Sequence, residues 1–285
     1  QANISRIEKP TKIIGNVDGV EIKIPKTLQE AKSRVIITDT GFDPLFGFSG
    51  GPASLVRYFA GDAIAEAFRR RKNNYPSPGE ETASSLFANE FADFLNESVS
   101  IEILPSKEGI SGIHCGNLID AHTSASKQLL DTSRVSMKRD IHALIVSTAG
   151  DGSDSTLADG LKAVWNVVGG MKDKGHLTLI AECSDGLGSE ALKMYVSDRL
   201  DVKNLLKRGK YIEGLEDLVY IQTALPRSTL ILVSALPDYY TEIKMGFHTC
   251  RKAGDALSYI LSTTGARTKV HILHNGSVTL PSKKE

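Results

Sequence analysis

Three glycine-rich segments contain the residues whose types and spacing are best suited to chemistry. They are Gly-Phe-Ser-Gly-Gly at 47–51, Thr-Ala-Gly-Asp-Gly-Ser-Asp at 148–154 and Ser-Asp-Gly-Leu-Gly-Ser at 184–189. Such segments can present backbone N–H groups to an anion where a strand meets a helix N-terminus, although the same spacing is typical of ordinary capped loops. The candidate substrate- or anion-binding residues are Gly47, Ser49, Gly50, Gly51, Gly150, Asp154, Gly186 and Gly188.

The 47–51 segment also matches GxSxG, the nucleophile elbow of α/β-hydrolases, with Ser49 as the nucleophile. An elbow needs its serine between a strand and a helix that follow each other directly. Here the predicted strand ends near Thr38 and the predicted helix starts near Asp62. A serine hydrolase using Ser49 is therefore the third-ranked function, and a loop that lets backbone approach a ligand fits better.

Nucleotide and metal motifs are incomplete. Gly186 and Gly188 supply the first two glycines of GxGxxG, but position 191 is Ala, and the sequence has no Walker loop. The seven histidines form neither HxxxH nor HExxH. His114 and His122 flank a Gly-Asn turn, which makes His122 the one candidate metal ligand, with an ordinary surface or core histidine as the alternative. Spacing alone predicts no metal site.

Composition narrows the class of protein. The 285 residues include 34 basic and 34 acidic side chains, for a net charge of zero, and 41% are hydrophobic. A nucleic-acid-binding surface normally shows a basic excess, and a membrane span needs about 18 consecutive apolar residues, so we expect neither partner. Three widely spaced cysteines without CxxC favour a reducing, cytoplasmic compartment.

The elements that must position these residues fall into two groups. In the first part, we predict a strand at 34–38, a long loop at 41–54, helices at about 62–72 and 80–96 with Asp62 as a helix cap, and a strand at 99–104 paired with 111–115. These elements indicate an N-terminal α/β domain over 1–131 that carries the 47–51 loop.

The second part alternates strands and helices. We predict strands at 142–147, 177–183, 230–234 and 270–274, and helices at 156–168, 190–199, 202–208, 215–224 and 252–263, with Gly265 ending the last helix. A strand, helix, strand unit of this length implies parallel strands and a right-handed crossover. The fold class is therefore α/β, and residues 132–285 form a doubly wound, mostly parallel, Rossmann-like domain.

Several of these segments, in the same order, resemble one family. From about Ile13 to Pro281 the chain is similar to the nickel-pincer lactate racemases, the 2-hydroxyacid racemase family. The matching pieces are 14–22, the 47–51 loop, Ala121-His122, 145–154 and 177–188. The resemblance implies a lactate-racemase-like α/β protein of two domains. Its cleft would hold a pyridinium-thioamide nickel cofactor that takes a hydride from the α-carbon of a hydroxy acid and returns it.

The chain departs from the family where that cofactor is held. The family attaches it to a lysine two positions after Gly-Gly, where this sequence has Ala53, preceded by Pro52. The family's proton-transfer histidine is replaced by Asp43, and its nickel-ligating histidine by Arg69. Because Ala53 has no amine, we predict that the nickel-pincer nucleotide is absent or not covalently bound. Asp43 titrates near pH 4 when unperturbed and is a poor acid in neutral solution.

One further catalytic position is retained in the second domain. Lys162 matches a lysine of the family in the helix after a Gly-Gly loop, with Asp154 preserved and Asp159 in place of a glutamine. Lys162 and Asp43 are accordingly the candidate catalytic residues. The alternative for Lys162 is an exposed helix lysine. The family's upstream substrate-contact motifs have no counterpart, which indicates either that the first domain is truncated at its start or that this branch dispensed with them.

We expect a divergent isomerase or racemase-type enzyme acting on a small 2-hydroxy or keto acid. The partner is then a small carboxylate-containing molecule, held by the three glycine-rich loops and by Lys162. The alternative is a non-catalytic family member that binds a small anion or a partner protein.

Overall fold

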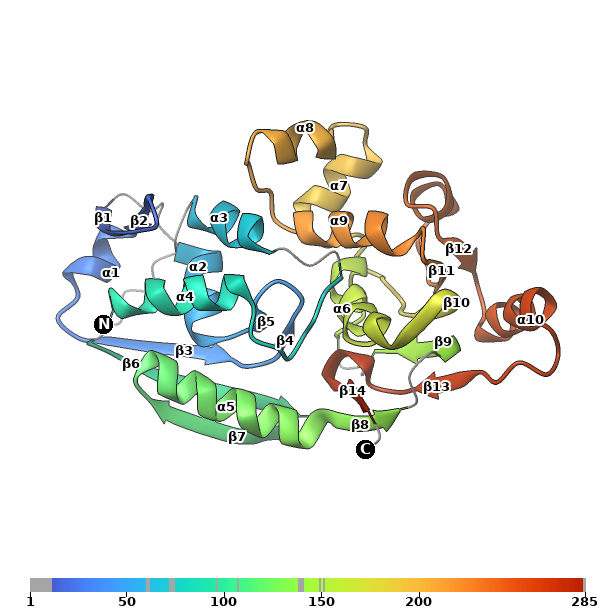
Figure 1. The fold of residues 1–285 in the computed structure, drawn as a ribbon, viewed down its shortest axis with the longest axis horizontal. Coiled ribbons are helices and arrows are strands. Elements are labelled where there is room, and N and C mark those ends of the chain that lie inside the picture. Colours follow the sequence, from blue (N-terminus) through green and yellow to red (C-terminus); the bar gives the residue numbers. More distant parts are fainter. Residues whose placement is uncertain are drawn as a thin grey trace. The chain divides into compact units, whose positions relative to one another are not determined.

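The computed structural model describes residues 12–59, 62–71, 75–95, 97–106, 108–137, 141–148, 150 and 152–283. Within it the chain forms two compact units (Figure 1). Unit 1 comprises Gln1–Lys72, Gly79–Thr132 and Gly209–Tyr211, and unit 2 comprises Asn73–Pro78, Ser133–Arg208 and Ile212–Glu285.

Two short segments, Asn73–Pro78 and Gly209–Tyr211, lie in one unit although the chain on either side of them lies in the other. A tyrosine in each segment explains this assignment. Tyr75 donates a hydrogen bond to the carbonyl of Thr223 (3.4 Å), and the guanidinium of Arg227 lies 4.1 Å from its ring centroid. Tyr211 packs on Phe68, with 5.9 Å between ring centroids. Each contact ties its segment to one unit.

Unit 1 is built on a three-stranded sheet in the order β3-β6-β7. β3 (Arg34–Asp39) runs parallel to β6 (Ser98–Ser106), and β6 is antiparallel to β7 (Gly109–Gly116). The predicted strands at 34–38, 99–104 and 111–115 are therefore confirmed. The remaining elements are the hairpin β1 (Lys12–Val17) and β2 (Val20–Ile24), the short pair β4 (Phe42–Asp43) and β5 (Gly47–Phe48), and helices α1 (Lys26–Glu30), α2 (Gly51–Phe59), α3 (Ala63–Arg70), α4 (Ala83–Asp93) and α5 (Leu118–Ser133).

The predicted loop at 41–54 is wrong in its second half, because α2 begins at Gly51. Pro52 suits the first turn of a helix, where no hydrogen-bond donor is needed. Leu55 and Val56 then bury the inner face of α2 against the helical layer. α2 is therefore a helix that the sequence does not predict, whereas the helix predicted at about 62–72 is present as α3.

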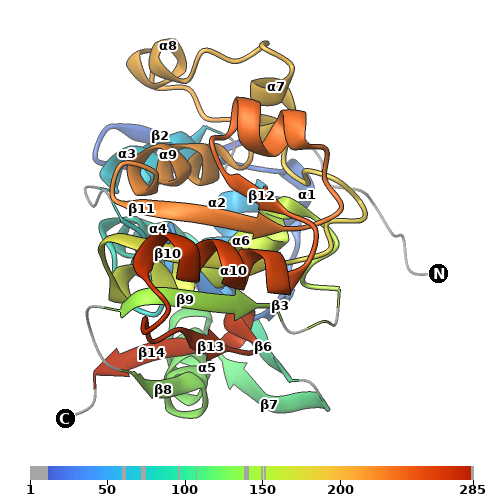
Figure 2. The ribbon, with the colours of Figure 1, turned by 90° about the vertical axis from the view of Figure 1, so that its right-hand side faces the viewer.

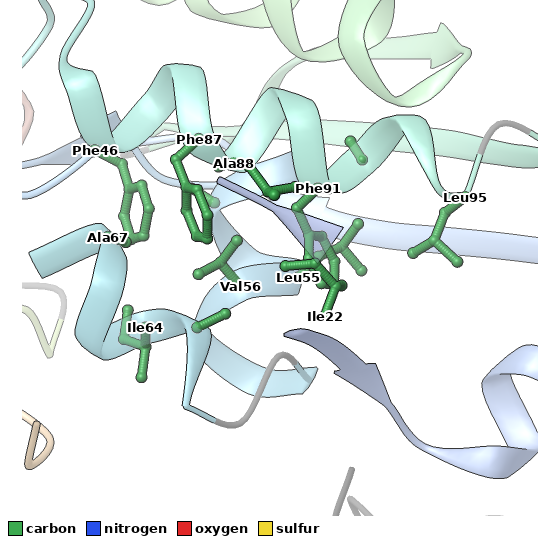
Figure 3. Packing of buried hydrophobic residues seen from close by; sticks show 14 of the residues in the cluster. Ile22, Phe46, Leu55, Val56, Ile64, Ala67, Phe87, Ala88, Phe91 and Leu95 are labelled. Carbon is green, nitrogen blue, oxygen red and sulfur yellow. The ribbon is translucent and has the colours of Figure 1, made fainter. Parts of the chain in front are cut away.

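The core of unit 1 lies between α2, α3 and α4. Figure 3 shows Phe87 and Phe91 of α4 pointing toward Val56 and Leu55 of α2, with Ala67 of α3 beside them. Both phenylalanines are fully buried. Burial of one such side chain stabilises the fold by about 1.5–3 kcal/mol, so this helical layer fixes α2 firmly.

The residues of β6 alternate in burial, and its polar side chains face inward. Ser98, Ser100 and Glu102 are buried, whereas Val99 is half exposed. The inner face of this sheet is consequently a polar surface, and it needs internal hydrogen-bond partners.

Unit 2 confirms the predicted fold class, α/β with a parallel sheet. Its five strands are ordered β12-β11-β10-β9-β13, and every neighbouring pair is parallel. They are β12 (His248–Cys250), β11 (Ser228–Val233), β10 (Met171–Ile180), β9 (Ile141–Ser147) and β13 (His271–Leu273). A separate parallel pair joins β8 (Arg134–Met137) to β14 (Leu280–Lys283).

Helices cover both faces of this sheet (Figure 2). On one face, Ala256 and Ile260 of α10 (Ala253–Thr264) pack with Ala143 and Ile231. On the other, Leu161 of α6 (Leu157–Val167) lies among leucines of β10 and β11. The other helices are α7 (Glu190–Val196), α8 (Val202–Lys207) and α9 (Leu215–Ala224), with the short turns η1 (Val168–Gly170), η2 (Tyr239–Lys244) and η3 (Gly276–Val278). None of the helices in the described residues is long and apolar enough to span a bilayer.

Candidate functional site

The glycines of the 47–51 loop allow other residues of the protein to pack closely against the loop backbone. Gly47 has a φ of +84°, and a Cβ there would lie 1.8 Å from the carbonyl oxygen of Glu80. A Cβ on Gly50 would lie 2.7 Å from a carboxylate oxygen of Glu102, and one on Gly51 would lie 2.9 Å from Cβ of His122. The close approach that the sequence indicates therefore exists, and it is made by Glu102 and His122.

Ser49 lies between β5 and α2, which is nearer to an elbow than the predicted element boundaries suggest. Its Oγ accepts a hydrogen bond from the N–H of Gly41 (2.9 Å), and its own N–H donates to the Gly41 carbonyl (2.9 Å). Among the described hydrogen bonds, none joins Ser49 to an imidazole. A serine nucleophile requires that bond to its base, so the structure gives the hydrolase interpretation no support.

A buried carboxylate, Glu102, lies behind the loop. Its side chain is 0% exposed and accepts hydrogen bonds from the hydroxyls of Ser100 (2.6 Å), Thr38 (2.9 Å) and Thr40 (2.9 Å). Burial by itself would raise the pKa of Glu102. His122 and the hydroxyls of Ser100 and Thr40 outweigh that effect, so the pKa lies below its usual value. Glu102 is therefore ionised at neutral pH.

His122, on α5, lies beside this carboxylate. Its Nδ1 is 3.7 Å from Oε2 of Glu102, and its side chain is 15% exposed. The ring of Phe48 meets the imidazole edge-on, with 6.4 Å between centroids. No group of three His, Cys, Asp or Glu residues among those described is arranged to hold a metal ion. The described residues therefore provide His122 with no set of fellow metal ligands.

Asp43, a candidate catalytic residue, has both carboxylate oxygens engaged. Oδ1 accepts from the N–H groups of Leu45 and Phe46, each at 2.8 Å, and Oδ2 pairs with Nη2 of Arg57 at 2.7 Å. These contacts shape the turn between β4 and β5. They explain why an aspartate can be buried here, because its carboxylate is fully hydrogen-bonded within the protein.

The residues present do not fit a cofactor attached through a lysine. Ala53 is 4% exposed and belongs to the hydrophobic core of unit 1. Arg69, at the position of the family's metal-ligating histidine, pairs with Glu66 at 2.6 Å. Neither position offers an amine or imidazole to a nickel-pincer group.

Unit 2 has an open pocket of about 600 Å³ at the carboxyl ends of its strands. In parallel sheets this edge is where ligands bind. The pocket is lined by Ser147, Thr148, Gly150, Asp154, Ile180, Ala181, Glu182, Val233, Ser234, Ala235 and Arg251. It thus brings together Gly150 and Asp154, which the sequence analysis singled out, with Glu182 and Arg251, which it did not.

Arg251 is the single cationic residue in this lining, where Asp154 and Glu182 are the acidic ones. Its Nη1 donates to the carbonyls of Ser234 (2.9 Å) and Leu236 (2.8 Å). Its Nη2 pairs with Asp238. The guanidinium is thereby held in place at the pocket rim. Arg251 directly follows β12, a three-residue strand that the sequence does not predict, so no local signal indicated it.

The other predicted residues lie outside this lining. The 184–189 loop meets the start of α6, where the N–H groups of Leu157 and Ala158 donate to the carbonyls of Gly186 and Leu187. These helix N-terminal N–H groups are therefore used within the protein and cannot hold an anion. Gly188 serves packing, since a Cβ there would lie 2.5 Å from Oγ1 of Thr156.

Lys162 lies on the exposed face of α6 and pairs with Asp159 at 3.0 Å. Asp159 also accepts a hydrogen bond from the hydroxyl of Thr156. This is the geometry of a surface pair three residues apart on a helix, which contributes a few tenths of a kcal/mol at most (about 0.2–0.5).

Comparison with known proteins identifies the fold. No protein-family model matches the chain, and no curated protein matches it in sequence. Among solved structures, it is similar to the lactate racemase apoprotein from Thermoanaerobacterium thermosaccharolyticum, with a TM-score of 0.81 and 20% identity over 95% of this chain and 68% of that one. It is also similar to a structural-genomics protein from Thermotoga maritima, with a TM-score of 0.64 and 13% identity over 93% and 70% of the two chains.

These likenesses define a lactate-racemase-like α/β fold. At such low sequence identity they establish the fold and leave activity to the residues of the site.

Proposed function

We propose that this protein is a divergent member of the lactate racemase family that binds a small 2-hydroxy or keto acid in the pocket of unit 2 and acts on it as an isomerase. The observation that carries the proposal is the lining of that pocket. Arg251, Asp154 and Glu182 lie at the carboxyl ends of parallel strands, in a fold shared with a lactate racemase apoprotein. Neutral net charge and three free cysteines support a cytoplasmic protein without nucleic-acid or membrane partners.

The three charged groups suit the two ends of a hydroxy acid. A guanidinium pairs with a carboxylate through charge-assisted hydrogen bonds. Ionised Asp and Glu side chains only accept hydrogen bonds, and a ligand hydroxyl can donate to them. A simple dicarboxylate would satisfy Arg251 but would meet repulsion from Asp154 and Glu182.

Ligand binding is tested by thermal unfolding in the presence of D-lactate, L-lactate, pyruvate or glycerol. A ligand at 100 times its Kd stabilises the folded state by about 2.7 kcal/mol, so we expect a rise in Tm with the acids and none with glycerol. Arg251→Gln should abolish the rise. The matched control is Arg227→Gln, because Arg227 lies in the same unit outside the pocket lining. No shift with any acid would contradict the proposal.

Isomerase activity is tested by following the enantiomer ratio of lactate on a chiral column. We expect interconversion that Arg251→Gln reduces and Arg227→Gln leaves intact. Binding without interconversion would favour the second candidate, a non-catalytic family member that senses a small anion. That candidate is supported by the engaged carboxylate of Asp43 and the buried Ala53.

A further inference from the structure

We propose that Glu102 and His122 form a proton-transfer site in unit 1, in which Glu102 orients the imidazole and Nε2 of His122 exchanges a proton with an acidic C–H or O–H group of a small molecule. Both residues belong to unit 1, and the proposal does not rest on the pocket of unit 2. The juxtaposition that carries it is the 3.7 Å between Nδ1 of His122 and Oε2 of Glu102.

The carboxylate is fixed before any ligand arrives. Glu102 accepts hydrogen bonds from three hydroxyls, those of Thr38 in β3, Thr40 just after β3 and Ser100 in β6. Thr38 and Thr40 donate to Oε2, and Ser100 donates to Oε1. An ionised carboxylate accepts about four hydrogen bonds, so one acceptor position is left, on Oε1. The imidazole of His122 lies beside the same carboxylate, with Nδ1 3.7 Å from Oε2.

The environment of Nδ1 selects the imidazole tautomer. Nδ1 is buried and has no hydrogen-bond partner in the described residues. An unprotonated Nδ1 would place its lone pair against a carboxylate oxygen, which is repulsive. A protonated Nδ1 is attracted to it and needs only a small closure to form a hydrogen bond, as apo sites often do. The neutral imidazole then carries its proton on Nδ1 and leaves Nε2 as an acceptor.

The far side of the ring is accessible. The side chain of His122 is 15% exposed, and Nε2 is not among the buried polar atoms that lack a partner. Gly51 makes this placement feasible, because a Cβ there would lie 3.0 Å from Cγ of the imidazole. The Gly-Gly pair thus admits a histidine whose Nδ1 lies beside a carboxylate and whose side chain is 15% exposed.

A carboxylate-oriented imidazole is a general acid and base at neutral pH. Its substrates are small molecules with a proton made acidic by a neighbouring carbonyl. In the step, Nε2 takes the C–H proton, the C–H electron pair forms the enolate, and the proton returns from the imidazolium or exchanges with water. No oxidant or reductant is needed.

The tautomer is tested first, by histidine-selective ¹⁵N NMR of the full chain. We expect His122 to carry its proton on Nδ1 in the wild type and to lose that preference in Glu102→Gln. Thr40→Val, which removes one donor to Glu102, serves if Glu102→Gln does not fold. An Nε2-protonated His122 in the wild type would overturn the proposal.

Proton transfer is tested by exchange of the pyruvate methyl protons in deuterated buffer. We expect protein-catalysed exchange that His122→Gln lowers by roughly 10²–10⁴-fold. His142→Gln is the matched control, because His142 is exposed in unit 2. Absence of exchange in the wild type, or exchange unaffected by His122→Gln, would show that the pair is only structural. Arg251→Gln should leave the exchange unchanged, because Arg251 lines the pocket of unit 2 and not this site. Failure of one site is thereby distinguished from failure of the other.

Discussion

Glu102 is the residue on which the polar interior of unit 1 converges. A buried carboxylate is costly unless it is hydrogen-bonded, and here three hydroxyls and an imidazole surround it. Gly50 and Gly51 give it and His122 room. The 47–51 loop, β6 and α5 therefore all pack around one ionised group, the carboxylate of Glu102.

The pH dependence of stability follows from the lowered pKa of Glu102. Its unfolded-state pKa is about 4.3, so the stability it contributes is present above that pH and is lost as the pH falls through the lower folded-state pKa. We expect the free energy of unfolding in urea to fall more steeply between about pH 5 and about pH 3 in the wild type than in Glu102→Gln. The exposed Glu97→Gln is the control and should retain the wild-type slope. Equal slopes for all three proteins would contradict this assignment.

Cys115 and Cys183 should differ sharply in reactivity. Cys115 is exposed, whereas burial, with Asp154, Asp159 and Glu182 nearby, raises the pKa of Cys183 to about 12. Because the thiolate is the reactive species, iodoacetamide at neutral pH should modify Cys115 and spare Cys183 in the folded protein. Mass spectrometry of peptides reads this out, with urea-unfolded protein as the positive control. Rapid labelling of Cys183 in the native state would refute the prediction.

At the scale of elements, Gly47 joins the short β4–β5 pair to the chain that precedes α4. It combines a φ of +84° with direct contact against the backbone of Glu80. Gly47→Ala should therefore destabilise the protein by about 3 kcal/mol or more. Gly254→Ala is the contrast, since this helix glycine has open space around it, and it should stabilise by about 0.5–1 kcal/mol. Urea titrations compare them, and similar effects of the two changes would be inconsistent with this reasoning.

The elements that the sequence did not predict have weak local patterns. α2 begins with Gly, Pro and Ala, which give no amphipathic pattern in the sequence. Its buried face becomes evident only in the structure, where Leu55 and Val56 pack in the same core as α4. α5 buries mainly small residues, although Asn117 accepts a hydrogen bond from the N–H of Asp120 and marks its start. That capping residue is the signal that could have located the helix bearing His122.

At the scale of the whole molecule, each unit has its own hydrophobic core. Independent cores predict separate unfolding events, so calorimetry should resolve two transitions. Gly47→Ala should lower the Tm of the unit 1 transition. Leu232→Ala creates a cavity in unit 2 and should lower the Tm of the other transition, because it destabilises that unit by about 2–5 kcal/mol. A single transition that responds equally to both variants would show that the units unfold together.

The sequence by itself determined the α/β class, the parallel arrangement of unit 2 and the likeness to lactate racemases, because hydrophobic periodicity and motif order are local properties. It also placed Gly150 and Asp154 at the carboxyl edge of a strand. Only the tertiary structure joined Arg251 to that edge, buried the polar residues of β6 and set Glu102 beside His122. Those contacts join residues far apart in the chain. Their distances depend on how strands and helices pack, which no local pattern specifies.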